Sequence, residues 1–181
     1  MSESTEMTEI QLRPATEADR PFLEDMFREA DTWGTDRPLS ENFDDDLKKY
    51  VGTWDESQGG VIVEKNGTPI GATWLLNLTS ELPGSGYVKD GIPELAIAMA
   101  RGNTGAGLGR MLLNAALAAA RDADKPGVSL AVDKGNDRAY HVYEKLGFVE
   151  VDYNKKTDCH VMLYDFAQHE GDMHILSSQG N

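Results

Sequence analysis

Apolar positions along the chain change their spacing from segment to segment, between the alternation of a strand and the three-and-four spacing of a helix. Alternating or short apolar runs predict strands at 10–13, 60–65, 68–76, 94–100, 128–132, 148–153 and 160–165. Helical spacing predicts helices at 17–30, at 40–50, from the glycine-rich run 101–109 to about 123, and between Asn136 and Gly147. The resulting order, β-α-α-β-β-β-α-β-α-β-β, predicts a mixed α/β fold.

Local signals fix several of these boundaries. Thr16 and Asp19 have the spacing of a capping box before the first helix, and Asn66-Gly67 between two apolar runs predicts a tight β-hairpin. Gly147 is expected to end the last helix. Apolar stripes are predicted on three helices: Phe22, Leu23, Met26 and Phe27; then Leu108, Met111, Leu112, Ala115 and Ala119; then Ala139, Val142, Tyr143 and Leu146.

Composition is that of a folded domain, because 40% of the 181 residues are apolar and 27% are charged. We expect one domain at 9–166, a flexible tail at 1–8 and a polar tail at 167–181. The acidic start and the lack of a long apolar run predict neither a signal peptide nor a membrane span. The single cysteine, Cys159, can form no internal disulfide, so we expect a cytoplasmic protein without a membrane partner.

Charge is strongly negative and unevenly distributed. The chain has 17 basic and 31 acidic residues, a net charge of −14, which argues against a nucleic-acid partner. Residues 1–60 hold 16 acidic and 6 basic residues, whereas residues 101–156 hold 7 acidic and 9 basic ones. The second segment therefore tolerates an anionic ligand and the first attracts a cationic one. An acidic surface kept for solubility is the alternative.

The glycine-rich run 101–109, between a predicted strand and a predicted helix, is suited to a phosphate group. Glycines let the backbone approach a ligand closely, and the following helix directs its first N–H groups at that ligand. The run is not a nucleotide P-loop, because no lysine follows, and it lacks the third glycine of a dinucleotide fingerprint. A purely structural glycine turn is the alternative.

Two motifs resemble those of the GCN5-related N-acetyltransferases (GNAT). The segment from Gly107 to Leu113, Gly-Leu-Gly-Arg-Met-Leu-Leu, resembles motif A of that family. Asn136, Ala139 and the run Tyr143 to Phe148 resemble its motif B. The element order also resembles the family's fold, a single domain with a mostly antiparallel mixed sheet splayed into a V, over about residues 9–166. The chain departs from the family at Thr104, where glutamine or arginine is usual.

The resemblance implies that acetyl-CoA is the co-substrate and that its binding needs no metal. Its pantetheine arm would pair with the backbone of the strand at 94–100, and its pyrophosphate with the glycine-rich loop. The implied cofactor-binding residues are Ile97, Ala98, Met99, Thr104, Gly105, Ala106, Gly107, Leu108, Gly109, Arg110, Asn136 and Tyr143.

Acetyl transfer to an amine needs an acid, a base and a donor to the oxyanion. Tyr143 occupies the family's usual acid position, and a backbone N–H near Met99 is the expected oxyanion donor. Glu94 is a candidate base, because shielding beside Pro93 and Leu95 would strengthen a carboxylate as a base. Asp133 and a chain of water molecules are alternatives, and an exposed Glu94 or a core Tyr143 without a catalytic role also stays open.

We therefore expect an acetyl-CoA-dependent N-acetyltransferase that transfers the acetyl group directly to a small cationic amine or a peptide amine. The acidic first two helices and their loop would form the acceptor side, with Trp33 and Trp54 as candidate walls or as ordinary packing residues. A non-catalytic acyl-CoA sensor or scaffold is the alternative. A second copy of the chain is a candidate partner. The four histidines have no shared metal-ligand spacing, so no metal site is expected.

Overall fold

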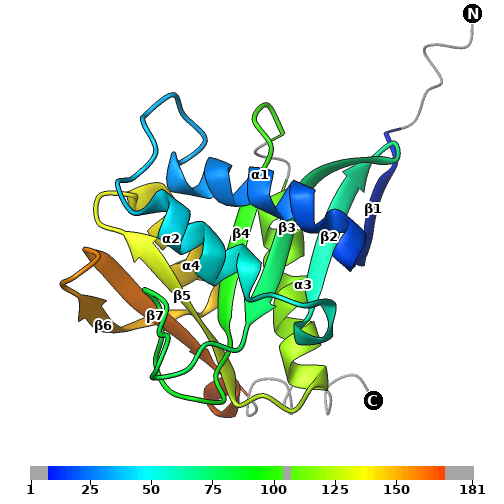
Figure 1. The fold of residues 1–181 in the computed structure, drawn as a ribbon. Coiled ribbons are helices and arrows are strands. Elements are labelled where there is room, and N and C mark those ends of the chain that lie inside the picture. Colours follow the sequence, from blue (N-terminus) through cyan, green and yellow to red (C-terminus); the bar gives the residue numbers. More distant parts are fainter. Residues whose placement is uncertain (1–7, 104–106, 170–181) are drawn as a thin grey trace, which may run out of the picture. The chain divides into compact units, whose positions relative to one another are not determined.

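The order of helices and strands matches the predicted order in the structure, a computed structural model that describes residues 8–103 and 107–169 (Figure 1). The strands are β1 (Ile10–Pro14), β2 (Gly60–Lys65), β3 (Thr68–Leu76), β4 (Glu94–Met99), β5 (Gly127–Asp133), β6 (Val149–Asn154) and β7 (Cys159–Asp165). The helices are α1 (Arg20–Asp31), α2 (Phe43–Leu47), α3 (Leu108–Asp122) and α4 (Asp137–Leu146). Short helical turns are η2 (Glu17–Asp19), η3 (Lys48–Gly52) and η4 (Glu56–Gln58). The mixed α/β class is therefore confirmed.

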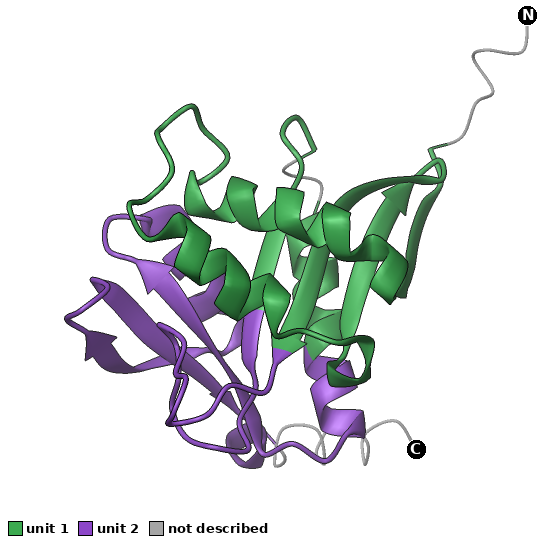
Figure 2. Ribbon diagram, in the orientation of Figure 1, with its two compact units in different colours: residues 1–75, 96–116 green, residues 76–95, 117–181 purple. Residues whose placement is uncertain are grey.

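The chain divides into two compact units, each built from two chain segments (Figure 2). Unit 1 comprises residues 1–75 and 96–116, and unit 2 comprises residues 76–95 and 117–181. Strand β4 contributes to both, with its first two residues in unit 2 and its last four in unit 1. The domain limits at 9 and 166 stay a prediction, since most of both tails lies outside the described residues.

Unit 1 contains the strand order β1-β2-β3-β4. The pairs β1–β2 and β2–β3 are antiparallel, and the predicted hairpin turn is confirmed. Asn66 and Gly67 have φ angles of 52° and 83°, the left-handed values that this two-residue turn requires. Along one face of these strands, α3 packs its first turns on the sheet. The apolar cluster contains Val63, Ile70, Leu108 and Leu112, with Ile10, Leu12, Val61, Ile97 and Met99 packed against it.

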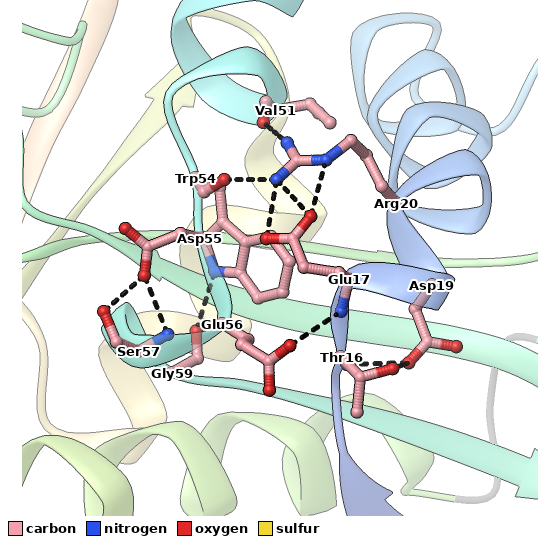
Figure 3. Close-up of polar contacts among 10 residues, drawn as sticks. All are labelled: Thr16, Glu17, Asp19, Arg20, Val51, Trp54, Asp55, Glu56, Ser57 and Gly59. Atoms are coloured by element: carbon pink, nitrogen blue, oxygen red, sulfur yellow. Dashed lines mark hydrogen bonds and ion pairs between the residues drawn. The ribbon is translucent and has the colours of Figure 1, made fainter.

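The segment after α2 is held by partly buried hydrogen bonds in unit 1. The predicted helix at 40–50 is divided between α2 and the π-helical turn η3. The Arg20 side chain on α1 donates to the carbonyls of Val51 and Trp54 and pairs with Glu17 (Figure 3). Trp54 is 1% exposed, and its indole N–H donates to Gly59 O (Figure 3). Trp54 is therefore a packing residue and no candidate pocket wall.

Unit 2 contains the strand order β4-β5-β7-β6. The pairing of β4 with β5 is parallel and aligns Glu94 with Ser129, whereas β5–β7 and β7–β6 are antiparallel. Aromatic contacts run from α4 to β7, since the Phe148 ring meets both Tyr143 and Tyr164 edge-on. Gly147 ends α4 with a φ of 117°, as predicted.

Two predicted helix stripes differ from the buried residues. On α3, Met111 is 40% exposed, and on α4, Val142 is 36% exposed. The α3 sequence is rich in alanine on every side, so its spacing does not single out one face, and the larger leucines determine which side is buried. The buried residues of α3 are Leu108, Leu112, Leu113, Ala116, Leu117 and Ala120. Within the described residues, no helix combines the length and apolarity that a bilayer crossing requires.

Candidate active site

The predicted site residues are distributed over both units. Unit 1 holds the end of β4 and the start of α3, which carry the expected cofactor contacts. Unit 2 holds Glu94, Asp133, Asn136 and Tyr143, the residues with expected chemical or positioning roles. The three consecutive residues Thr104, Gly105 and Ala106 lie outside the described residues, so their predicted contacts with pyrophosphate remain predictions.

The last residues of β4 are fixed by contacts within unit 1. Ile97 and Met99 are half-buried and pack against the apolar cluster, and Ala98 between them is also half-buried. The buried Thr73 hydroxyl donates to Ala96 O at 2.9 Å. The N–H of Ala100 donates to Ile70 O at 2.8 Å, which joins the end of β4 to β3. These contacts hold the stretch whose backbone is predicted to pair with the pantetheine arm.

The start of α3 has the features of an anion-binding helix end. Gly107 has a φ of 75°, and its carbonyl accepts the N–H of Met111 at 3.0 Å. The first amides of a helix have no acceptor within that helix, so those of Leu108 to Arg110 suit a phosphate oxygen. Leu108 is buried in the apolar cluster, whereas the Arg110 side chain is exposed. Among the described residues, none lies within 4 Å of a methyl group added to Gly107 or Gly109.

Glu94 opens β4 as predicted, and it is 3% exposed. The alternative of a solvent-exposed carboxylate is therefore wrong. Ser129, fully buried, stands at the paired position on β5, so the two side chains lie on the same face of the sheet. The Ser129 backbone N–H donates to Pro93 O at 3.0 Å and fixes the start of β4 against β5. A buried carboxylate is a costly feature that folded proteins retain where it has a function or a partner.

Asp133 and Asn136 follow the end of β5. Asn136 stands at the N-cap position of α4, but its side chain makes no capping hydrogen bond. Its backbone N–H donates to Asp133 O at 3.0 Å. The Asp133 side chain is exposed and accepts from the Cys159 thiol at 3.3 Å. The Asn136 side chain therefore does not cap α4, and its contact with the cofactor arm stays a prediction.

Tyr143 lies on the half-buried face of α4, with its ring centroid 6.0 Å from that of Phe148. Loss of solvent raises the pKa of Tyr143 to about 12. The hydroxyl therefore keeps its proton over the physiological pH range. A proton donor needs this property before the reaction begins.

Cys159, His160 and His169 each contact a neighbouring side chain within the described residues. Burial raises the pKa of the Cys159 thiol to about 12, which makes it a poor nucleophile. His160 contacts Glu150 at 3.1 Å, and His169 stacks on Tyr164 with ring centroids 4.0 Å apart. His141 is exposed on α4, and His174 lies outside the described residues. No group of three or more ligating side chains within the described residues could hold a metal ion.

The acidic segment that is predicted to face the acceptor makes contacts that the sequence did not reveal. Arg101, just after β4, pairs with Glu29 at 3.1 Å and with Asp36 at 2.6 Å. Asp31 accepts hydrogen bonds from the backbone and hydroxyl of Ser40, both at 2.8 Å. Arg101 and Glu29 are 72 residues apart in the sequence, so no local pattern could have predicted their ion pair. Exposed carboxylates remain at Glu41, Asp44 and Asp45.

A family model, described as the acetyltransferase (GNAT) family, matches residues 20–148, more than half of the chain. The chain belongs to the GNAT acetyltransferase family. The resemblance inferred from the glycine-rich loop and the Asn136–Phe148 motif is thereby confirmed, and so is the expectation of an enzyme. None of the curated proteins matches the chain in sequence.

Solved GNAT-fold structures support the same fold. The PaiA N-acetyltransferase of Thermoplasma acidophilum, in complex with coenzyme A, is 17% identical with a TM-score of 0.65 and covers 87% of this chain and 99% of its own. YncA of Salmonella typhimurium, with acetyl-CoA, is 20% identical with a TM-score of 0.61, over 89% and 96% of the two chains. Mutant forms of the spermidine/spermine N-acetyltransferase SpeG of Vibrio cholerae are 22% identical with a TM-score of 0.61, over 91% and 99%.

Proposed function

We propose that the protein transfers the acetyl group of acetyl-CoA directly to a primary amine, with a cationic small molecule or peptide amine as acceptor. Family membership and the glycine turn before α3 support acetyl-CoA as co-substrate, and two solved structures of the same fold hold coenzyme A or acetyl-CoA. The burial of Glu94 at the start of β4 is the single observation that carries the catalytic assignment.

In the proposed reaction, Glu94 accepts a proton from the acceptor ammonium. The free amine then attacks the thioester carbonyl, and a new C–N bond forms while the oxyanion is stabilised by a backbone N–H near Met99. Collapse of the tetrahedral intermediate breaks the C–S bond. The nitrogen, which is positively charged after the attack, loses a proton as coenzyme A leaves as a thiolate, and the thiolate takes up one proton. Glu94 then returns its own proton to solvent, so the products are the acetylated amine and the free thiol.

Tyr143 is the proposed donor to the leaving sulfur. A phenol with a pKa of about 12 is a weaker acid than an ordinary thiol, whose pKa is about 8.5. Complete proton transfer from Tyr143 to a free thiolate is therefore uphill. Tyr143 is therefore proposed to donate a hydrogen bond that strengthens as negative charge builds on the sulfur. Asn136, in the same motif, is proposed to contact the cofactor arm.

A cationic acceptor is proposed because exposed carboxylates remain on and before α2. Glu41, Asp44 and Asp45 carry negative charge on the segment that the family resemblance assigns to the acceptor side. Such charges raise the encounter rate of a cation, and salt screens them over about 8 Å at physiological ionic strength. The ion pairs of Arg101 with Glu29 and Asp36 make this field weaker than the charge count alone predicts.

An acetylation screen across amine charge classes, at low and high salt, tests the acceptor proposal. We expect cationic amines to react fastest and their kcat/KM to fall as salt rises, while neutral amines show little salt dependence. Faster turnover of neutral or anionic amines would contradict it. Binding of acetyl-CoA without release of coenzyme A for any amine would instead favour the sensor alternative.

A further inference from the structure

We infer that Arg101 is a positioning residue that couples the end of β4 to the loop between α1 and α2. The inference rests on the proposed function, because it assigns the end of β4 to the cofactor and the α1–α2 loop to the acceptor. Arg101 follows Met99 by two residues, and its side chain reaches α1 and the loop after it, all within unit 1.

All three nitrogens of the Arg101 guanidinium are used. Nε donates to the Glu29 carboxylate at 3.1 and 3.2 Å, Nη1 donates to Asp36 at 2.6 Å, and Nη2 donates to Thr35 O at 2.5 Å. An isolated pair with Asp36, whose side chain is 97% exposed, would contribute little. Glu29 is 21% exposed, and the planar guanidinium joins both carboxylates and a backbone carbonyl at once. Together these contacts form a network around one rigid group.

Both ends of this connection are anchored in the backbone. On the β4 side, Ala100 bonds to β3, and Asn103 closes a turn by donating to Ala100 O at 3.1 Å. On the α1 side, Gly34 donates to Glu29 O at 2.8 Å and Thr35 donates to Thr32 O at 3.1 Å. A shift at the end of β4 is therefore transmitted through the Arg101 side chain to Thr35 and Asp36.

The loop that Arg101 contacts has a strained backbone at Trp33. Trp33 has a φ of 58°, which bulky side chains rarely adopt, and its ring is covered by the Arg37 guanidinium at 3.8 Å. Such a conformation persists only where surrounding contacts fix it. Arg101 supplies contacts on both sides of Trp33, through Glu29 and through Thr35. A shift at the end of β4 on cofactor binding would thus reach the loop that carries Trp33.

Hydrogen exchange on the full-length protein, with and without acetyl-CoA, tests the coupling without requiring an identified acceptor. In the wild type, we expect acetyl-CoA to slow exchange in peptides covering residues 29–40. Arg101→Ala should speed exchange there about three- to tenfold without ligand and abolish the slowing by acetyl-CoA. Arg101→Lys, which can keep one ion pair, should lie between, and Lys65→Ala at the exposed hairpin controls for loss of one positive charge.

Calorimetric titration separates this role from direct phosphate binding. Arg101→Ala and the double variant Glu29→Gln/Asp36→Asn should each bind acetyl-CoA with a Kd within about threefold of the wild-type value. With a reactive amine, each variant should raise the KM for the acceptor more than it lowers kcat. A tenfold loss of acetyl-CoA affinity in Arg101→Ala alone would overturn the inference in favour of a phosphate contact. Unchanged exchange at 29–40 would also overturn it. Failure of the wild type to bind acetyl-CoA would overturn the proposed function as well. The other two outcomes would overturn only the role of Arg101.

Discussion

At the scale of single residues, Tyr143 combines a half-buried ring with a hydroxyl that stays protonated. Tyr143→Phe keeps the ring contact with Phe148 and removes only the donor. We expect kcat to fall by about two orders of magnitude while acetyl-CoA affinity and thermal stability change little. Steady-state rates, calorimetric titration and thermal unfolding check this. Loss of folding or of acetyl-CoA binding would assign Tyr143 a structural role instead.

The raised pKa of Tyr143 also predicts the basic side of the pH profile. Because its protonated form is the donor and its pKa is about 12, titration of Tyr143 should produce no decline in kcat between about pH 8 and pH 10. The Phe variant lacks the titrating group and provides the reference for any decline with another cause. A decline near pH 9 in the wild type that is absent from the variant would contradict the assignment.

Glu94 differs from Tyr143 because its role depends on the protonation of the acceptor. Glu94→Gln preserves shape in the buried position but removes the base, so we expect the rate deficit to be largest near pH 7. The deficit should shrink toward pH 10, where more of an amine with pKa near 10.4 is already deprotonated. Asp133→Asn is the matched comparison. A deficit independent of pH in Glu94→Gln, or the same pattern in Asp133→Asn, would remove Glu94 as the base.

At the scale of elements, the segment between β3 and β4 lies tightly against β5. A methyl group on Gly86 would approach the Leu130 carbonyl carbon to 2.6 Å and the Ala131 nitrogen to 2.8 Å. Both atoms belong to the backbone of β5, which cannot move aside as a flexible side chain could. We expect Gly86→Ala to lower the free energy of unfolding by about 1–3 kcal/mol. Gly52→Ala is the control, since its methyl group would meet only Lys48 Cβ at 3.8 Å. Equal urea midpoints for both variants would contradict the packing described.

The guanidinium of Arg13 on β1 joins two carboxylates, one on β2 and one just before α1. Arg13 makes two hydrogen bonds of 2.8 Å to Asp19 and one of 2.9 Å to Glu64. Chiefly through the hydrogen bonds from Arg13, the pKa of Asp19 is held below its usual 3.8. A lowered folded pKa adds stability above the unfolded pKa, and this stability is lost as the pH falls through the folded pKa.

Asp19→Asn should therefore destabilise the protein by about 1–3 kcal/mol at pH 7, and the difference from wild type should shrink below about pH 4. Denaturant unfolding at several pH values measures both effects. Asp25→Asn, at an exposed position on α1, should show neither. A difference between Asp19→Asn and wild type that stays constant down to acid pH would show that the carboxylate charge does not matter.

Several elements were predictable because their signals are local. The Asn66-Gly67 turn, the order of strands and helices and the end of α4 at Gly147 follow from backbone preferences of neighbouring residues. The split of the second helix at Lys48 and the buried face of α3 were not predicted, because they depend on distant packing. The same limit applies to the burial of Glu94 and to the contacts of Arg101 with Glu29 and Asp36.

At the scale of the whole molecule, two regions of charge support one reaction scheme. The net charge of −14 is concentrated in residues 1–60, and the glycine-rich loop and following elements carry a slight excess of positive charge. Both motifs that first indicated the GNAT family lie in this second region, and the family match spans residues 20–148. This distribution of charge along the sequence is the one that a polyanionic co-substrate and the proposed cationic acceptor would each favour.

Release of coenzyme A, measured together with the acetylated product, tests the central claim most directly. Purified protein is supplied with acetyl-CoA and one amine at a time, and thiol release and product mass are followed. We predict equal amounts of coenzyme A and N-acetylated amine for at least one cationic amine, at a rate that falls about 100-fold in Tyr143→Phe. Binding of acetyl-CoA with no amine-dependent release of coenzyme A across all charge classes would contradict the account.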